Sequence, residues 1–363
     1  MKYTYSTLPL GSIIGIIGGG QLGRMLAMSV AQYGYHAHIF TPEENSPASE
    51  VAKFTTIAAY DDEAALKSFA ANIAVITNEF ENIPASTAQL LAQLKPLYPS
   101  PKLFAICQHR LHEKDFINAN GGKTANYMQA KSLAELQIAA SQIGFPCLVK
   151  TATFGYDGKG QAWLHDASDC ETAWNELNHF ELIIEELVPF VCEASIIIAR
   201  NPQGEVTYFP IAENIHENGI LRRSICPANI SVAVSAAMQQ MAKKIAEAGE
   251  LIGIMAVECF ILANDEVLIN ELAARPHNSG HFSMNGCNIS QFEMLVRICA
   301  GLPMIEPKLL HPIVMHNLLG DEVLDLQQYF YNPNAFVHLY GKANAMQGRK
   351  MAHVNIIYPP KEK

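Results

Sequence analysis

The chain has 363 residues, of which 49% are hydrophobic, and it carries 25 lysines and arginines against 35 aspartates and glutamates. This length predicts two or three domains with real cores, and the net charge of -10 argues against a nucleic-acid-binding protein. No apolar run reaches the roughly 18 residues of a membrane helix, and the N-terminus is a poor signal peptide. The eight cysteines are scattered without a C-x-x-C pair, which predicts free thiols in a cytoplasmic protein.

The first segment has the pattern of a βαβ unit. A buried strand over residues 12–17 ends in a G-x-G-x-x-G loop at 18–23, and a helix over 25–33 and a strand over 36–40 follow. Such glycines let backbone N–H groups approach a phosphate at a helix N-terminus. A dinucleotide site expects an acidic residue after the second strand, where Thr41 stands instead. A tight strand-to-helix turn is at least as well supported as NAD binding, and binding of another phosphate stays open.

A further strand of the parallel type is predicted at residues 73–76, and Glu79 lies in the loop after it. Ligands of open α/β sheets gather at the carboxyl ends of strands. Glu79 is therefore either a substrate contact or a solvated loop residue. Three prolines between residues 96 and 101 then mark a boundary before a helix that begins near Leu103.

A second glycine-rich loop lies between two short strands. The strand at 147–150 ends in Lys150, and the loop at 151–161 contains three glycines and Lys159. Backbone of this kind can close over a phosphate, and the two lysines favour a nucleotide over a plain hairpin. A strand over 182–188 follows, and the linker after it has backbone groups that could read an adenine edge.

Two carboxylates are predicted to face each other across a β-hairpin. Apolar runs at 254–262 and 267–272 flank a short polar turn. With the turn centred on the 264–265 peptide, Glu258 lies directly opposite Glu271, and both side chains project from one face. Opposed carboxylates repel each other, and a divalent cation between them reverses the sign of that interaction. Because the neighbouring residues are apolar, we interpret the pair as a Mg²⁺ site and not as a solvated face.

Two other polar clusters follow the hairpin. Its second strand continues into RPHNSGH at residues 275–281, a group of hydrogen-bond donors without an obvious packing role. Helices are predicted at 231–249 and 289–300, and a strand and turn at 314–320. The tail holds a compact basic set, Lys342, Arg349 and Lys350. Basic side chains in a glycine-containing loop suit a phosphate, and a solvated loop is the alternative if no phosphorylated substrate is indicated.

Together these motifs resemble the ATP-grasp ligases, in which a glycine-rich hairpin and a hairpin with two Mg²⁺ carboxylates clamp ATP. The strings GGGQLGRM, FGYDGKGQ, ELAARPHNSGH and a terminal K-x₆-RK are similar to the branch of that family that carboxylates 5-aminoimidazole ribonucleotide. The resemblance runs from about Gly11 to the C-terminus. It implies an α/β ATP-grasp fold with an N-terminal Rossmann-like domain over 1–107, a central lobe over 108–188 and a C-terminal α+β lobe over 189–363.

The reaction implied by the resemblance is carboxylation of the amine of 5-aminoimidazole ribonucleotide in purine biosynthesis. Bicarbonate attacks the γ-phosphate of ATP to form carboxyphosphate, which releases CO₂ beside the amine. ATP and Mg²⁺ are the implied cofactors. The implied partners are the small-molecule substrates, with no nucleic acid and no membrane, and the implied assembly is a homodimer.

The resemblance also implies roles for individual residues, with Glu258 and Glu271 as the metal ligands. The implied nucleotide-binding residues are Arg110, Lys150, Gly155, Tyr156, Asp157, Gly158, Lys159, Gly160, Gln161, Glu185, Glu186, Leu187, Val188, Glu193, His216, Asn270 and Glu271. The implied substrate-binding residues are Gly20, Gln21, Glu79, Tyr156, Asp157, Lys342, Arg349 and Lys350. The residues implied to orient carboxyphosphate are Arg275, His277 and Asn278, and Asp157 is the implied proton acceptor.

Three other functions stay open on the sequence. A formate-dependent glycinamide ribonucleotide transformylase shares the metal hairpin and would require formate in place of bicarbonate. An NAD-dependent dehydrogenase built on residues 18–23 would bind NAD without Mg²⁺. A nucleotide-binding sensor would bind ATP without turnover, and the presence of both Glu258 and Glu271 argues against it.

Overall fold

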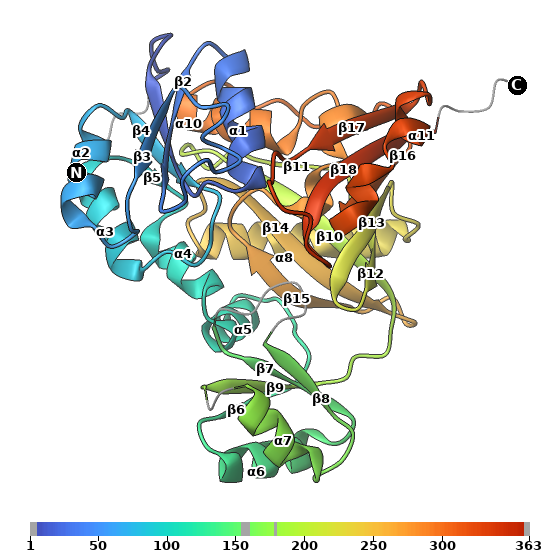
Figure 1. Ribbon diagram of the computed structural model, residues 1–363. Coiled ribbons are helices and arrows are strands. Elements are labelled where there is room, and N and C mark those ends of the chain that lie inside the picture. The colour runs from blue at the N-terminus through green and yellow to red at the C-terminus, as the bar shows by residue number, and fades with distance from the viewer. Residues whose placement is uncertain (1–5, 154–159, 178–179, 359–363) are drawn as a thin grey trace, which may run out of the picture.

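Three β-sheets organise the computed structural model, which describes residues 6–153, 160–177 and 180–358. The described strands form a five-stranded sheet within residues 13–98, a four-stranded sheet within 127–186 and a nine-stranded sheet within 190–357. Figure 1 shows the four-stranded sheet below the other two. The domain boundaries predicted at 107 and 188 stay predictions. Among the described helices, none has the length and apolar character needed to cross a membrane.

The N-terminal sheet is parallel throughout, in the order β3-β2-β1-β4-β5. Helices follow all of its strands except β2, and the central strands are buried and read as continuous apolar runs. The elements are β1 (Ile13–Ile17), α1 (Gln21–Gln32), β2 (His36–Thr41), β3 (Phe54–Ile57), α2 (Glu63–Ala71), β4 (Val75–Asn78), α3 (Ala85–Leu94), β5 (Leu97–Tyr98) and α4 (Pro101–Cys107).

Two predicted boundaries in this sheet are wrong. Helix α1 begins at Gln21 and not at residue 25, because its first N–H groups have a partner elsewhere in the chain that the local sequence does not reveal. Strand β4 covers Val75–Asn78 and not 73–76, since its pairing with β1 begins at Val75. Ile73 is buried in the turn before the strand, and because it is apolar it made the predicted strand begin too early.

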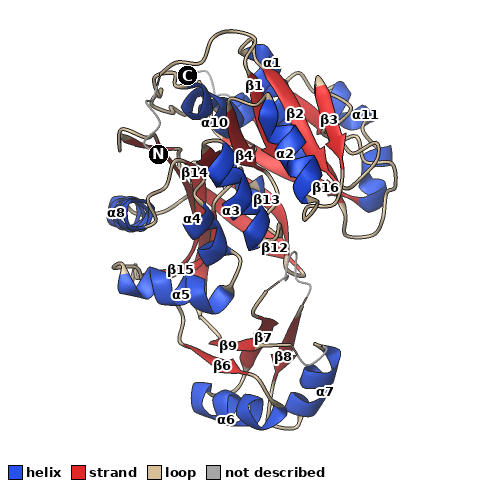
Figure 2. Ribbon diagram, turned by 90° about the vertical axis from the view of Figure 1, so that its left-hand side faces the viewer, coloured by secondary structure: helices blue, strands red, loops and turns tan. Residues whose placement is uncertain are grey.

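The central sheet is antiparallel, in the order β6-β9-β7-β8. Figure 2 shows α6 and α7 on its outer side, away from the other two sheets. In β7, Cys147 and Val149 pack toward these helices, so the alternating residues Leu148 and Lys150 project from the inner side. The elements are α5 (Arg110–Ala119), β6 (Tyr127–Ala130), α6 (Leu133–Ile143), β7 (Cys147–Thr151), β8 (Gln161–Leu164), α7 (Asp169–Glu176) and β9 (Leu182–Glu186).

The C-terminal sheet is antiparallel, in the order β15-β14-β10-β12-β13-β16-β18-β17, and β11 pairs with β10. It contains the predicted hairpin, and Ser231 and Gly249 cap the predicted helix α8. The elements are β10 (Phe190–Arg200), β11 (Val206–Tyr208), β12 (Ala212–Glu217), β13 (Ile220–Cys226), α8 (Val232–Ala248), β14 (Gly253–Leu262), β15 (Val267–Ala273), η1 (Asn278–Gly280), α9 (Ser283–Gly286), α10 (Gln291–Ala300), β16 (Ile313–Leu319), η2 (Gly320–Leu324), α11 (Gln327–Phe330), β17 (Ala335–Leu339) and β18 (Lys350–Ile357).

The N-terminal and C-terminal sheets share one hydrophobic core. Helix α10 contacts α1 and β4 on one side and β10 and β14 on the other. Its side chains are buried almost throughout, and Phe292 and Leu295 belong to the same cluster as Leu26 of α1 and Ile254 of β14. Among its residues only Glu293 and Arg297, one turn apart on one face, are partly exposed, so the helix is buried between the two sheets. The central sheet has a separate core of its own, between α6 and α7.

Three imidazole rings lie in contact inside the C-terminal lobe, and those of His338 and His353 are stacked. The ring centroid of His353 lies 4.7 Å from that of His281 and 4.5 Å from that of His338. Burial lowers the pKa of all three, that of His338 to about 4, and the neighbouring imidazoles also lower the pKa of His281 and His353. The rings are therefore neutral in the folded protein at neutral pH.

We predict that the protein loses stability as the pH falls from 7 toward 4. The unfolded imidazoles take up protons near pH 6.5, whereas burial makes the folded rings resist protonation, that of His338 until the pH approaches 4. The free energy of unfolding is therefore greatest above about pH 6.5 and falls as the pH drops below it. The shift of His338 alone contributes about 3 kcal/mol. Urea unfolding at several pH values measures this slope, which His338→Gln should reduce. An equal slope in that variant would contradict the assignment.

Candidate active site

One cavity of about 1020 Å³ is lined by residues of the central and C-terminal sheets, of α5, and of α1 and the loop after β4 beside the N-terminal sheet. Most of the predicted site residues that the structure describes line it: Gly20, Gln21, Glu79, Arg110, Lys150, Gln161, Glu185, Glu186, Leu187, Val188, Glu193, His216, Glu258, Asn270, Glu271, Arg275, His277, Asn278 and Lys350. Gly160, Lys342 and Arg349 are described but do not line it. Gly155, Tyr156, Asp157, Gly158 and Lys159 lie outside the described residues.

The predicted pairing of Glu258 with Glu271 is confirmed, although the predicted turn is wrong. Near the turn Ile261 pairs with Val267, so the turn is centred on Asn264 and not on the 264–265 peptide. An irregularity at Asn270 then inserts one extra residue, and Glu258 lies opposite Glu271. A β-bulge shifts every pairing beyond it by one position. Here the bulge compensates for the displaced turn.

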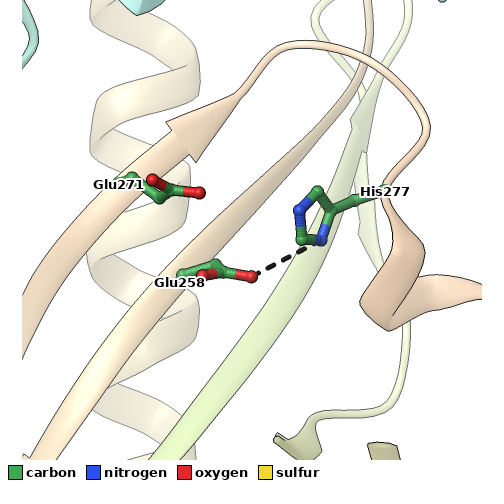
Figure 3. Close-up of side chains that lie close together, drawn as sticks. All are labelled: Glu258, Glu271 and His277. Carbon is green, nitrogen blue, oxygen red and sulfur yellow. Dashed lines mark ion pairs between the residues drawn. The ribbon is translucent and has the colours of Figure 1, made fainter. Parts of the chain in front are cut away.

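Three potential ligand atoms meet at the hairpin, from Glu258, Glu271 and His277, and they all lie within 4.8 Å of one another (Figure 3). Glu258 Oε1 lies 3.6 Å from His277 Nδ1. Burial and the charge of Glu271 raise the pKa of Glu258 to about 7. Burial, followed by the charge of Arg275, holds the pKa of His277 well below its usual range. Two crowded carboxylates fit Mg²⁺, which prefers oxygen ligands, whereas a neutral imidazole fits it less well.

The cations on the central-lobe side of the cavity are held by carboxylates. Lys150 Nζ and Lys114 Nζ lie 2.8 and 3.4 Å from the two oxygens of Glu185. Burial opposes ionisation of Glu185, but the charges of the two lysines outweigh it and lower its pKa to about 2. Arg110 lies 3.4 Å from Glu271. Three cationic side chains thus converge on one end of the cavity, next to the carboxylate pair.

The strand that precedes the linker between the central and C-terminal sheets is shorter than predicted. It ends at Glu186 and not at residue 188, because its partner strand begins at Cys147, directly opposite Glu186. Leu187 and Val188 are therefore outside the sheet, and both line the cavity. Their backbone groups are free of strand pairing in the described structure, as contact with an adenine edge requires.

Glu193 and His216 form an ion pair between neighbouring strands, with 2.7 Å between Glu193 Oε2 and His216 Nδ1. Burial on its own lowers the pKa of His216, but the hydrogen bond to Glu193 and the charge of Glu258 raise it overall. An irregularity in the β12–β13 pairing at His216 turns this strand locally. The pair fixes a carboxylate at the cavity wall, where it can accept hydrogen bonds from hydroxyl groups.

The glycine-rich loop before α1 holds a carboxylate of the chain itself. Gly20 N donates to Glu79 Oε1 at 2.7 Å, and Gly23 N donates to Glu79 Oε2 at 3.2 Å. A Cβ atom at Gly18 would lie 2.4 Å from Glu79 Oε1, so the glycine makes room for this side chain. Glu79 is 7% exposed, and its interpretation as a solvated loop residue is wrong. A pyrophosphate would need the same N–H groups, which excludes the NAD interpretation.

The RPHNSGH segment joins the C-terminal sheet to its neighbours. Arg275 Nε lies 2.9 Å from Glu81 Oε1 in the loop after β4. Asn278 and Asn317 exchange hydrogen bonds through their side-chain amides, at 3.0 and 2.7 Å. The segment thus presents Arg275 and His277 to the cavity from a fixed backbone.

The basic residues of the tail lie in and beside one loop. Lys342 Nζ donates to the carbonyl oxygen of Lys350 at 2.7 Å, and an Arg349 guanidinium nitrogen donates to that of Asn344 at 3.1 Å. Lys350 lines the cavity at the start of β18. The structure therefore brings Lys350 to the cavity. Lys342 contacts the backbone of Lys350, and Arg349 precedes it in the chain, but neither lines the cavity.

Comparison with known proteins identifies the family. Family models match at residues 12–108 (ribonucleotide synthetase preATP-grasp domain), 115–292 (ATP-grasp domain) and 313–363 (phosphoribosylaminoimidazole carboxylase C-terminal domain). The N5-carboxyaminoimidazole ribonucleotide synthase of Brucella melitensis is 42% identical over 98% of each chain. The chain belongs to the N5-carboxyaminoimidazole ribonucleotide synthase family.

Other members of this family agree in sequence and structure. The synthase of Bacillus subtilis is 40% identical over 97% of this chain and 93% of that protein. The chain spans 37% of the bifunctional purine synthesis protein purC/E of Dictyostelium discoideum, with 41% identity. A synthetase structure with ADP matches with a TM-score of 0.94 and 41% identity, over 98% of this chain and 95% of that one. The structure of the Aspergillus clavatus synthase with ADP and 5-aminoimidazole ribonucleotide matches with a TM-score of 0.90 and 28% identity, over 96% of this chain and 94% of that one.

Membership of this family confirms the resemblance to ATP-grasp ligases and the expected fold, with its pre-ATP-grasp domain. Several residues that line or support the cavity were missed: Glu81, Glu113, Lys114 and Asn317. The spacing of Arg110, Glu113 and Lys114 places all three on one face of a helix, and this spacing could have identified Glu113 and Lys114 from the sequence. Glu81 and Asn317 had none, because their partners are distant in the sequence.

We predict that Glu79→Gln destabilises the N-terminal sheet. A glutamine has one acceptor oxygen, so one of the two glycine N–H groups would face the amide nitrogen, at a cost of about 1–3 kcal/mol. Urea unfolding measures this cost, and Glu43→Gln in an exposed loop is the matched control. The affinity for ADP should stay within about twofold, because the side chains predicted to bind the nucleotide lie elsewhere in the cavity. Unchanged stability would contradict the role assigned to Glu79.

Proposed function

We propose that the protein catalyses ATP- and bicarbonate-dependent carboxylation of the amine of 5-aminoimidazole ribonucleotide, giving N5-carboxyaminoimidazole ribonucleotide, ADP and phosphate. The observation that carries this proposal is the opposed pair Glu258 and Glu271, which shares one cavity with Lys150, Arg110 and Arg275. The names of relatives and the Aspergillus clavatus complex with ADP and 5-aminoimidazole ribonucleotide support the choice of substrates.

Phosphoryl transfer from ATP to bicarbonate requires that the charge of the transferring group be neutralised. Lys150 and Arg110 would bind the phosphates, and both are held in place by carboxylates. Glu258 and Glu271 would hold Mg²⁺, which supplies Lewis-acid stabilisation of the phosphate oxygens when bound. Leu187 and Val188 would present backbone groups to adenine, and their position outside the sheet supports this.

Carboxyphosphate hydrolyses in water, so the site has to exclude solvent and orient donors on it. Arg275 is fixed by Glu81, and its charge would hold the carboxyphosphate oxygens beside the metal pair. The carbon–oxygen bond of carboxyphosphate breaks to release CO₂ and phosphate. The amine nitrogen then attacks CO₂ and gives up a proton, which the phosphate just released accepts. Lys350, which lines the cavity, would bind the monophosphate of the ribonucleotide.

The assay that tests this function measures ADP formation with each acceptor in turn. ADP should form only when bicarbonate and 5-aminoimidazole ribonucleotide are both present. Formate-dependent ADP formation with glycinamide ribonucleotide would replace our proposal with the transformylase. ATP binding without turnover under any of these conditions would indicate a nucleotide sensor.

We predict that Glu271→Gln lowers kcat at least about a hundredfold, because a neutral amide is a poor ligand for Mg²⁺. The fold should survive, since the substitution relieves the repulsion between two buried carboxylates. Steady-state ADP formation at increasing Mg²⁺ measures the effect, and circular dichroism confirms folding. Glu266→Gln, on the same hairpin beside Lys123, is the matched control. Activity at the unsubstituted level would refute the metal assignment.

We also propose a homodimer in the cytoplasm. The segment around α11 exposes large apolar side chains, Leu324, Phe330 and Tyr331, which a second copy would cover. All eight cysteines are free thiols, as expected in a reducing compartment. Light scattering after size exclusion tests the assembly, and a mass of about 40 kDa at micromolar concentration would contradict it.

A further inference from the structure

Strand β15, which carries Glu271, lies at the edge of its sheet. An edge strand leaves every other backbone group without a ladder partner. Three such groups of β15 have partners outside the sheet. Ile269 N donates to the carbonyl oxygen of Lys123 at 2.6 Å, Leu272 N donates to Glu113 Oε1 at 2.7 Å, and the carbonyl oxygen of Asn270 accepts from Lys114 Nζ at 3.4 Å. Helix α5 and the segment after it therefore cover this edge.

The spacing of these outward groups identifies the bulge. In a regular strand, the N–H groups that point away from the partner are two residues apart. Here Ile269 and Leu272 are three apart, because the extra residue Asn270 lies between them. Without the bulge, Leu272 N would point toward β14 and Glu113 would lose its donor. The hydrogen bond to Glu113 thus exists only in the register that places Glu271 opposite Glu258.

Lys114 connects the same bulge to the central lobe. Its Nζ lies 3.4 Å from the carbonyl oxygen of Asn270 and 3.4 Å from Glu185 Oε1 on β9. Glu113 and Lys114 are 3% and 2% exposed. Burying a charged side chain costs free energy of folding unless specific partners compensate for its lost hydration. Both partners of Lys114 belong to the ATP-binding cavity or to its metal hairpin.

We propose that Glu113 and Lys114 are positioning residues that hold the bulged register of β15 and thereby place Glu271 for the metal. This inference rests on the proposed function for the role of Glu271. Leu272 is buried in the core and favours the same register, so loss of Glu113 loosens the bulge without abolishing it. The consequence is a weaker grip on the cation, with the ribonucleotide end of the cavity unaffected.

The test compares Glu113→Leu, which removes the acceptor, with Glu113→Gln, which keeps an acceptor oxygen in the same place. Asp115→Asn on the same helix is the control, because its carboxylate binds Tyr127 and does not contact the bulge. The first measurement is hydrogen exchange of backbone amides in peptides covering 267–274, without substrates. We expect Glu113→Leu to raise exchange at Leu272 about tenfold relative to the rest of the chain, and the other two variants to exchange as the unsubstituted protein does.

The second measurement is the concentration of Mg²⁺ that gives half-maximal ADP formation. It should rise about tenfold in Glu113→Leu, while KM for the ribonucleotide stays within about twofold. Unchanged exchange at Leu272, or equally faster exchange over the whole chain, would overturn the proposal. If the protein shows no bicarbonate-dependent turnover, the proposed function fails while the exchange result still decides the register. Should Glu113→Leu not fold, Lys114→Met is tested in the same two ways.

Discussion

The repulsion between two buried carboxylates is the interaction on which the rest of the cavity depends. Glu258 and Glu271 face each other on adjacent strands, and burial makes their mutual repulsion stronger than it would be in water. A fold tolerates such a pair only when its surroundings compensate. Arg110 contacts Glu271, and the charge of His216 favours ionisation of Glu258. The hairpin therefore lowers the folding stability, and the proposed cation would offset this repulsion when bound.

The same logic extends to the other charges of the cavity. Lys150 is matched by Glu185, Arg275 by Glu81, and the glycine-loop N–H groups by Glu79. Each pairing joins residues that are distant in the sequence, and the one between Arg275 and Glu81 connects the C-terminal lobe to the loop after β4. The glycine-rich loop at residues 18–23 is one such case. In related nucleotide-binding folds such a loop takes a phosphate, whereas here it takes a carboxylate and helps to anchor the loop after β4.

The sequence was sufficient for the family and for many of the residues that line the cavity, because these were recognised from local motifs. It was insufficient where the structure depends on distant partners. The pairing of Glu258 with Glu271 was correct only because the bulge at Asn270 offset an error in the turn, and a single extra residue leaves no trace in the hydrophobic pattern. The start of α1 and the burial of Glu79 were missed for a related reason, since each depends on the other.

The core that α10 shares with α1 determines how the protein can open. Separating the N-terminal from the C-terminal sheet would expose Phe292, Leu295 and their neighbours to water, so burial of this core holds the two parts together. The central lobe has its own core and joins that body through α5 and the short linker at Leu187 and Val188. A movement of the central lobe would therefore leave the shared core intact, and the linker at Leu187 and Val188 would lie at its pivot.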